Sequence, residues 1–272
     1  PLDVPMSPGI PQAVQDTVTA IPTDLDRVRE ELAKGDVAAV IIEPTGASWG
    51  SIPVEAAFVQ ALPNLCQEHG AVFILDEVVT GFRLSPGGAQ QVLNITPDLT
   101  TMAKILAGGL PGGGVGGRAD ILERMEMRGD PPWDRGERVA HPGTFNANPL
   151  SAAAGVAVLR HLADGAVHTH MDGIAARLRN EIQDVFDRHD LGALVYGESS
   201  YFHVSMSGTP VRNGMAGAAG LALRRALHTH GIHILMGGGI VSAVHTDEDV
   251  DRTTEAFEAS VQDLEMDGLV TG

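Results

Sequence analysis

The chain contains two lysines, and one of them, Lys104, lies in a sequence that could support covalent chemistry. Apolar residues flank Lys104 on both sides, and a run dominated by glycine, residues 108–117, follows it. An apolar environment lowers the pKa of a lysine and so supplies the neutral amine that a Schiff base requires. An ordinary solvent-exposed lysine is the alternative, and the residues around Lys104 do not decide between the two.

The glycine run suggests two kinds of phosphate site. Gly112, Gly114 and Gly117 have the G-x-G-x-x-G spacing of dinucleotide-binding oxidoreductases. That fingerprint needs a strand directly before it and a helix directly after it, whereas Pro111 precedes these glycines and no helix follows at once. A P-loop needs its lysine after the glycines, and Lys104 precedes them. A dinucleotide-binding oxidoreductase is therefore retained only as the weaker alternative.

Two adjacent acids end the apolar run at residues 71–78, which is typical of a strand. In parallel α/β sheets, ligands bind beyond the carboxyl ends of the strands, where Asp76 would lie. Glu77 would point to the opposite face of the sheet. We expect one acid to serve a site and the other to serve the surrounding structure, although a solvated acid at a strand end is the alternative for Asp76.

A third candidate segment, HPGTFNANPLSAAAG at residues 141–155, places Gly143, Thr144 and Asn146 before a predicted helix. Free N–H groups and the helix dipole favour an anion there, and an ordinary capped helix start is the alternative. No HExxH motif or cysteine cluster is present, and Cys66 is the single cysteine, so no metal site is expected.

The elements that must position these residues follow a strand, helix, strand order in the first part of the chain. The predicted elements are strands at residues 36–44 and 71–78 with a helix at 53–70 between them, interrupted by Pro63. This βαβ order predicts a parallel sheet covered by helices on both faces. Residues 97–105 are a strand or an extended approach to Lys104. Residues 119–127 form a helix, residues 128–138 a loop, and the Ala-rich residues 148–164 a closely packed helix.

After residue 162 the pattern changes to a looser mixture of helices and strands. Helices are expected at residues 171–188, 216–230 and 247–266, and strands at 193–197, 201–206, 231–236 and 239–245. Such an order is typical of a small α+β domain. We therefore predict two domains, residues 1–162 and 163–272.

The composition limits the partners and the compartment. The 272-residue chain has a net charge of −17, which opposes binding to nucleic acid. No apolar run is long enough for a membrane span, and a single cysteine suits the reducing cytoplasm. The chain opens with a Pro-rich segment and no initiator Met, from which we expect that an N-terminal part is absent.

Several segments together resemble one enzyme family. They are EPTGASWG at residues 43–50, LDEVVTGFR at 75–83, TPDLTTMAKILAGGLPGGGVGG at 96–117, HPGTFNANPLSAAAG at 141–155 and SAVHTDEDVDRTTEAF at 242–257. They are similar to the class III, fold-type I pyridoxal-phosphate aminotransferases, and to the glutamate-1-semialdehyde 2,1-aminomutase branch in particular. The resemblance implies an α/β fold, with part of the cofactor-binding large domain followed by the small domain.

The resemblance also assigns roles to residues. Lys104 would form the Schiff base with the aldehyde of pyridoxal 5'-phosphate and move the substrate α-proton. Asp76 would pair with the pyridine nitrogen, and Val78, on the same strand face, would pack on the ring. Thr144 would bind the phosphate of the cofactor in the neighbouring subunit, which implies a homodimer. Glu43, at the end of the other buried strand, is a weaker candidate for ordering the site.

The implied function is amino-group transfer on a small amino acid or amino-aldehyde, either between molecules or within one. The family's N-terminal portion, which supplies a phosphate cup and an aromatic side chain stacked on the cofactor, is expected to be missing. The alternative is therefore a catalytically incomplete fragment of such an enzyme.

Overall fold

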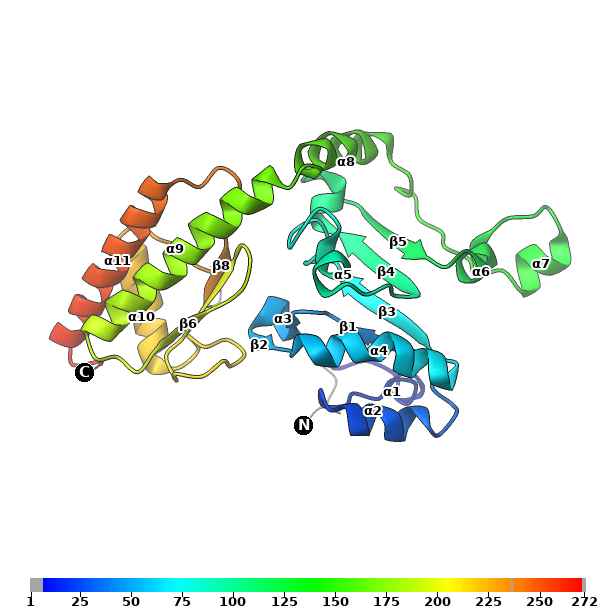
Figure 1. Ribbon diagram of the computed structural model, residues 1–272, viewed down its shortest axis with the longest axis horizontal. Coiled ribbons are helices and arrows are strands. Elements are labelled where there is room, and N and C mark those ends of the chain that lie inside the picture. The colour runs from blue at the N-terminus through cyan, green and yellow to red at the C-terminus, as the bar shows by residue number, and fades with distance from the viewer. Residues whose placement is uncertain (1–6, 236, 271–272) are drawn as a thin grey trace.

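A computed structural model describes residues 7–235 and 237–270 of the chain. Two bodies of secondary structure lie side by side, and helix α8 (Pro149–Leu162) runs across one end of the first of them (Figure 1). The first body also contains short elements that the sequence does not predict. These are α1 (Gln12–Gln15), α3 (Ala47–Gly50), β2 (Ile52–Pro53) and α5 (Gly88–Leu93).

The first body is built on a four-stranded sheet. Its strands are β1 (Ala39–Ile42), β3 (Val72–Glu77), β4 (Leu99–Ala103) and β5 (Gly113–Gly117), in the order β1-β3-β4-β5. The first three are parallel to one another, and β5 is antiparallel to β4. The predicted α/β class and mostly parallel sheet are therefore confirmed, and residues 99–103 are a strand.

Helices cover one face of this sheet. Helices α2 (Leu25–Leu32) and α4 (Ala56–His69) pack on the side chains of Phe73 and Leu75, which are 1% and 0% exposed. The opposite face carries Ile41 and Val115, which are 61% and 38% exposed. The prediction of a sheet covered by helices on both faces is thus wrong within the described residues, because the helices around this core lie on one side only.

Helix α4 continues through Pro63 without the predicted interruption. A proline in a helix removes one backbone hydrogen bond, which usually breaks the helix. Here Val59, Leu62 and Leu65 form a buried apolar face on both sides of Pro63, and this packing holds the helix together. The helix ends at Gly70 in the left-handed conformation, as the sequence predicts.

The glycine run does not form a nucleotide-binding loop. A 3₁₀ turn, η1 (Lys104–Ala107), follows β4, and the glycines then return as β5, paired with β4. A Cβ on Gly117 would lie 2.1 Å from the backbone oxygen of Asp98, so this position requires glycine. The next helix, α6 (Ala119–Leu122), has only four residues. The strand–glycine turn–helix geometry of a dinucleotide site is therefore absent from these described residues.

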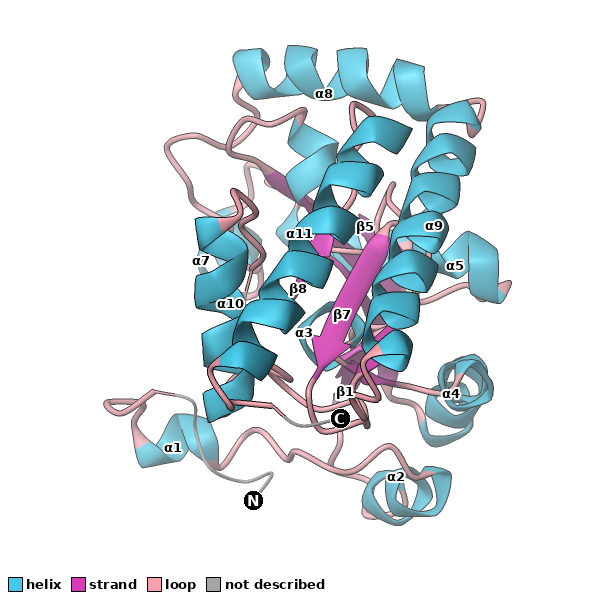
Figure 2. Ribbon diagram, turned by 90° about the vertical axis from the view of Figure 1, so that its left-hand side faces the viewer, coloured by secondary structure: helices cyan, strands magenta, loops and turns pink. Residues whose placement is uncertain are grey.

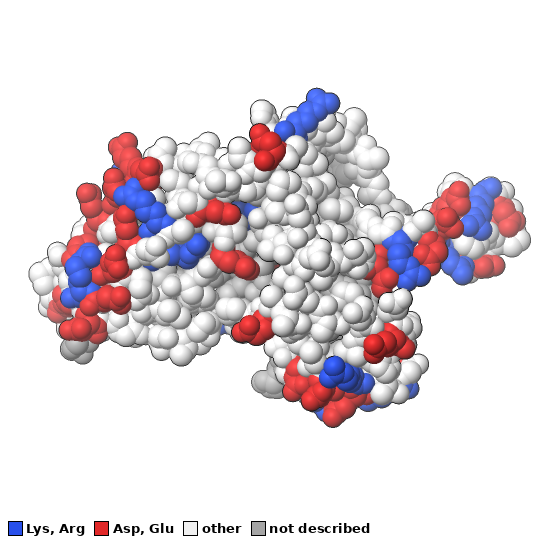
Figure 3. All heavy atoms as spheres, in the orientation of Figure 1, with Lys and Arg blue, Asp and Glu red and all other residues white. Residues whose placement is uncertain are grey.

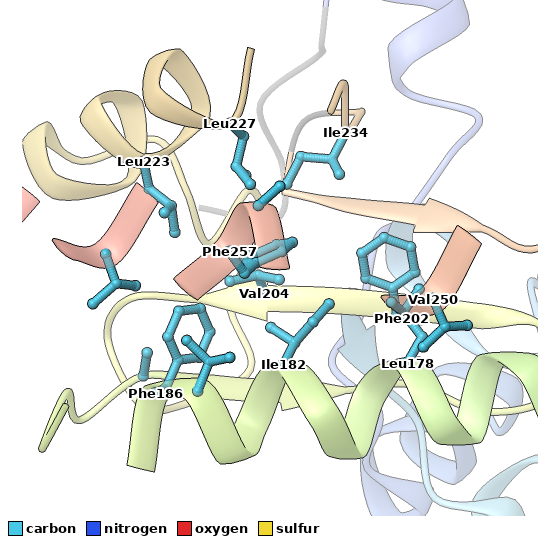
Figure 4. Close-up of a cluster of buried hydrophobic side chains, with 14 of the residues drawn as sticks. Leu178, Ile182, Phe186, Phe202, Val204, Leu223, Leu227, Ile234, Val250 and Phe257 are labelled. Carbon is cyan, nitrogen blue, oxygen red and sulfur yellow. The ribbon is translucent and has the colours of Figure 1, made fainter. Parts of the chain in front are cut away.

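The second body is a small α+β unit. Its strands β6 (Leu194–Tyr196), β7 (Tyr201–Ser205) and β8 (Gly238–Ile240) form an antiparallel sheet. Helices α9 (Ala166–Arg188), α10 (Ala218–Thr229) and α11 (Asp247–Met266) pack around it (Figure 2). Side chains such as Ile182, Val204 and Phe257 form its buried core (Figure 4). This separate core supports the proposed boundary near residue 162, which stays a prediction.

Two local predictions are wrong. Residues 128–138 contain helix α7 (Pro131–Gly136) rather than only a loop, because Pro131 suits the first turn of a helix and the Trp133 indole bonds the Glu126 carbonyl. The strand expected at residues 231–236 is reduced to a bridge between Leu235 and Gly238, and residue 236 lies outside the described residues. The helix expected at residues 119–127 is α6 followed by a 3₁₀ turn, η2 (Glu123–Met125).

Charged side chains gather over the C-terminal helices, over α2 and over the α6–α7 arm, and a largely uncharged area lies between them (Figure 3). Within the described ranges, no single helix is long and apolar enough to cross a membrane. Helices α8 and α9 together have the length and composition of a membrane span, but the pair is bent by 74°. The described residues contain no group of three or more His, Cys, Asp or Glu side chains that could hold a metal ion.

Candidate active site

Three of the predicted residues meet at the carboxyl edge of the sheet. Glu43 follows the end of β1, Asp76 is the second-to-last residue of β3, and Lys104 follows the end of β4. The sheet register places Asp76 beside Thr101, three residues before Lys104. The charges of Asp76 and Lys104 both act on the Glu43 carboxyl. Parallel strands bring their carboxyl ends to one edge, and this edge is where α/β sheets bind ligands.

The Asp76 carboxylate is held in one orientation. Its Oδ1 accepts a hydrogen bond from the Val78 backbone N–H at 3.0 Å and from the Thr101 hydroxyl at 3.1 Å. No residue in the described ranges donates a hydrogen bond to Oδ2. Asp76 is half-buried on the open face of the sheet. The carboxylate thus keeps one oxygen for a ligand.

Glu77, on the opposite face, is a structural residue and is 1% exposed. Its carboxylate accepts four hydrogen bonds of 2.6 to 3.1 Å from the Thr80 hydroxyl, the Ala89 N–H, and the backbone and side-chain N–H groups of Gln90. Two of these donors are backbone groups of the first turn of α5, which have no partner within the helix. A Cβ on Gly88 would lie 2.3 Å from Oε2 of Glu77. Glu77 thus serves the surrounding structure, as predicted for one of the two adjacent acids, and the site role of Asp76 stays a prediction.

Val78 lies in the turn after β3 and not on the strand itself. The prediction that it shares a strand face with Asp76 is therefore wrong, because the strand ends at Glu77. Its N–H instead turns back onto the Asp76 carboxylate. Packing of the half-buried Val78 side chain on a cofactor ring stays a prediction.

Lys104 has a left-handed backbone with φ of 49°, which is uncommon for a residue other than glycine. Its turn is held by a close approach of α8. A Cβ on Gly155 would lie 2.3 Å from the Leu106 carbonyl oxygen, and one on Gly108 would lie 2.4 Å from the Ala154 carbonyl oxygen. The close packing predicted for the Ala-rich helix is found here.

Lys104 itself is exposed, so of the two alternatives left open by the sequence, the described residues do not supply an apolar environment for its amine. The neighbouring apolar residues of η1 face α8 instead, and Ala107 is 4% exposed. The apolar residues on either side of Lys104 are therefore explained by the packing of the turn on α8, and they do not surround the amine.

Glu43 is bound within the loop that follows β1. Its Oε1 accepts a hydrogen bond from the Thr45 hydroxyl at 2.9 Å, and its Oε2 accepts one from the Trp49 N–H at 3.2 Å. Burial raises the pKa of the Glu43 carboxyl, and these two hydrogen bonds oppose that rise. Glu43 is therefore half-buried and accepts a hydrogen bond on each of its carboxylate oxygens.

Thr144 is exposed in a turn before α8 and has no hydrogen bond to the other candidate residues within the described chain. Asn148 is the N-cap of α8, and its side chain accepts the Leu150 N–H at 2.9 Å. The helix N-terminus is thus already capped. Phe145, beside Thr144, is 80% exposed. The part that Thr144 plays in a neighbouring subunit stays a prediction.

Two residues that hold the candidate site, Thr101 and Trp49, are not predicted from the sequence to do so. Thr101 orients Asp76, but its position depends on the register between β3 and β4. Trp49 contacts His203, which is 154 residues away in sequence, so no local pattern could link them.

The comparison with protein families identifies the chain. The model of the class-III aminotransferases matches residues 4–261. The chain belongs to the class-III aminotransferase family. This confirms the resemblance drawn from the sequence motifs.

Two curated relatives of this family member are glutamate-1-semialdehyde 2,1-aminomutases. The protein of Nitratidesulfovibrio vulgaris (strain Miyazaki F) is 37% identical over 95% of this chain and 61% of its own length. Aminomutase 2 of Brevibacillus brevis is 35% identical over 94% of this chain and 60% of its own length. The chain therefore spans about three fifths of the length of these relatives.

Solved structures of similar chains confirm the fold. An omega-transaminase from Sphaerobacter thermophilus superimposes with a TM-score of 0.84 and 34% identity, covering 96% of this chain and 60% of that one. A transaminase with PLP bound gives a TM-score of 0.82 and 30% identity, covering 97% of this chain and 62% of that one.

Proposed function

We propose that this class-III aminotransferase chain takes part in pyridoxal-phosphate-dependent transfer of an amino group. The observation that carries the proposal is the convergence of Asp76 and Lys104 at the carboxyl ends of neighbouring strands. The substrate would be a small amino acid or amino-aldehyde. Relatives named as aminomutases and transaminases both support the reaction class, and neither name selects between transfer within one molecule and transfer between two.

The side chains at this edge of the sheet carry the chemical groups that pyridoxal phosphate needs. The protonated pyridine nitrogen of the cofactor needs a hydrogen-bond acceptor, and the aldehyde on its ring needs a primary amine with which to react. Asp76 offers a carboxylate whose Oδ2 has no donor among the described residues, and Lys104 offers an exposed amine. The left-handed backbone of Lys104 is the kind of strain that persists at functional positions.

When bound, pyridoxal phosphate supplies a conjugated ring that stabilises negative charge at the substrate α-carbon. Asp76 would keep a proton on the ring nitrogen, and Thr101 with the Val78 N–H would hold the carboxylate in place for this task. Lys104 would attach to the aldehyde and then carry a proton to and from the α-carbon. Glu43 would order the neighbouring edge of the site.

The assembly and the location of the protein are also part of the proposal. Thr144 and the exposed Phe145 lie on a surface turn from which Thr144 would reach the cofactor phosphate of a second copy in a homodimer. The enzyme would act in the cytoplasm. A catalytically incomplete portion of such an enzyme is the second candidate, and the exposed Lys104 and the open sheet face favour it.

Covalent trapping tests the proposal. The chain is incubated with pyridoxal phosphate and reduced with borohydride, and the modified peptide is identified by mass spectrometry. Lys34 is the other lysine of the chain and is exposed beside Glu31, so Lys34→Arg and Lys104→Arg form a matched pair. We expect the adduct in Lys34→Arg and its loss in Lys104→Arg. Modification elsewhere would contradict the assignment, and absence of any adduct would support the incomplete portion.

A second assay separates the two reactions. The chain loaded with pyridoxamine phosphate is mixed with a series of keto acids, and consumption of the amine form is followed by absorbance. Consumption by keto acids supports an aminotransferase. Consumption only by an amino-aldehyde substrate supports an aminomutase.

A further inference from the structure

The loop that holds Glu43 has an unfavourable backbone. Ser48 and Trp49 both have left-handed φ angles, 54° and 57°, although neither is glycine. A Cβ on Gly46, whose φ is 101°, would lie 2.0 Å from the Ile52 carbonyl oxygen. Consecutive residues in this conformation persist only where surrounding contacts impose it. The contacts that hold this loop therefore determine where Glu43 finds its hydrogen-bond donors.

Those contacts come from the second body. The His203 Nε2 of β7 donates to the Trp49 carbonyl oxygen at 3.0 Å, and the two rings meet edge to face at 5.9 Å. Tyr196 of β6 stacks on His203 at 5.2 Å, and its hydroxyl donates to the Ser51 carbonyl oxygen at 2.7 Å. His203 is 5% exposed. Two side chains from residues 196–203 thus hold the C-terminal end of the left-handed segment, at Trp49 and Ser51.

Trp49 is bound on both sides of its own backbone. Its carbonyl accepts from His203, and its N–H donates to the Glu43 carboxylate. We propose that His203, backed by Tyr196, is a positioning residue that holds Glu43 through Trp49 and so couples the second body to the candidate active site. This inference depends on the proposed function only in assigning Glu43 to a cofactor site.

The chemistry of the clamp suits this role. Burial lowers the pKa of the His203 imidazole, so the ring is neutral and places its single N–H on Nε2, facing the carbonyl. A cleft of about 400 Å³ is lined by Trp49, Tyr196 and His203. The loop therefore has open space beside it and can shift when the clamp is loosened. Such a shift removes the Trp49 donor from Glu43.

Amide hydrogen exchange of the Trp49 N–H tests the coupling without any cofactor. His203→Phe keeps an aromatic ring and loses the donor, whereas His203→Gln keeps a donor and loses the ring. His230→Gln is a matched control, because the His230 side chain bonds Asp263 on α11 and makes no hydrogen bond to the described residues of the Glu43 loop. We expect about five-fold faster exchange in His203→Phe, the fold-change that loss of one neutral hydrogen bond gives. His203→Gln should recover part of the protection, and His230→Gln should match the parent chain.

The same variants are then trapped with pyridoxal phosphate at Lys104. Slower trapping in His203→Phe, partly restored in His203→Gln, is the expected result. If the parent chain forms no adduct, the proposed function has failed, and the exchange data still decide the coupling. If His203→Phe exchanges no faster than His230→Gln, the coupling is refuted. Should His203→Phe fail to fold, Tyr196→Phe removes the bond to Ser51, and unchanged exchange at Trp49 in that variant refutes the clamp.

Discussion

Replacement of Glu77 by glutamine tests how the strand that carries Asp76 is anchored. The Glu77 carboxylate is 1% exposed and accepts two hydrogen bonds on each oxygen. In Glu77→Gln one oxygen becomes an amide NH₂, which faces a backbone N–H, that of Ala89 or that of Gln90, whichever way the amide is turned. The Thr80 hydroxyl and the Gln90 side chain can turn to accept from the NH₂. At least one hydrogen bond to a charged acceptor is lost, so the free energy of unfolding should fall by at least about 1.5 to 3 kcal/mol.

The structural consequence is local to the site. Glu77 ties the end of β3 to the turn at Thr80 and to the first turn of α5. Loosening that turn moves the Val78 N–H, which orients Asp76. We therefore expect slower trapping of pyridoxal phosphate at Lys104 in Glu77→Gln, even where most molecules remain folded.

Urea denaturation followed by far-ultraviolet circular dichroism measures the stability change. Glu68→Gln is the matched control, because Glu68 is exposed on the last turn of α4. A surface change of this kind should alter stability by no more than about 0.5 kcal/mol. A Glu77→Gln chain within about 1 kcal/mol of the parent would refute the reasoning, since it would mean that the buried donors find other acceptors.

Three further predictions follow from individual contacts. Gly155→Ala places a Cβ 2.3 Å from the Leu106 carbonyl oxygen, so α8 must shift; we expect about 1 to 3 kcal/mol lower stability in urea and slower adduct formation. His189 lies between two carboxylates of α11, whose hydrogen bonds raise its folded-state pKa. The contribution of His189 to the stability of the fold is therefore complete below the unfolded pKa of about 6.5 and is lost as pH rises through the raised folded pKa. In His189→Gln, the melting temperature should accordingly vary less with pH over this range. Asp76→Asn keeps the shape but cannot hold a proton on the ring nitrogen, so the adduct at Lys104 should still form while amino transfer falls by about 10²-fold or more; unchanged turnover would contradict the role given to Asp76.

Much of the fold follows from local sequence. The continuous apolar run at residues 71–78 predicts a strand, and the two-residue period of a strand puts Asp76 and Glu77 on opposite faces, as found. The apolar periodicity of residues 171–188 and the acids that open residues 247–266 likewise predict most of α9 and the whole of α11. These features depend on interactions within a few residues, so the sequence contains the information for them.

Other features depend on contacts between distant segments. Pairing of Thr101 with Asp76 requires the register of β4 on β3, and a shift of one residue would turn the hydroxyl to the other face. The apolar residues around Lys104 leave open whether its amine is buried or exposed, and in the fold they pack on α8 and leave the amine exposed. Burial is a property of the assembled layers and not of the flanking residues.

The sequence alone determined the family of this protein, strands β1 and β3, and the three groups at the carboxyl edge, Glu43, Asp76 and Lys104, because motif spacing and side-chain periodicity are local. The tertiary structure decided how those groups are held: Thr101 through strand register, and Glu43 through a Trp49 peptide fixed by His203. The hydrogen bond between His203 and Trp49 joins residues 154 positions apart. The sequence around each residue is the same whether or not the other lies nearby, so no local pattern predicts the contact.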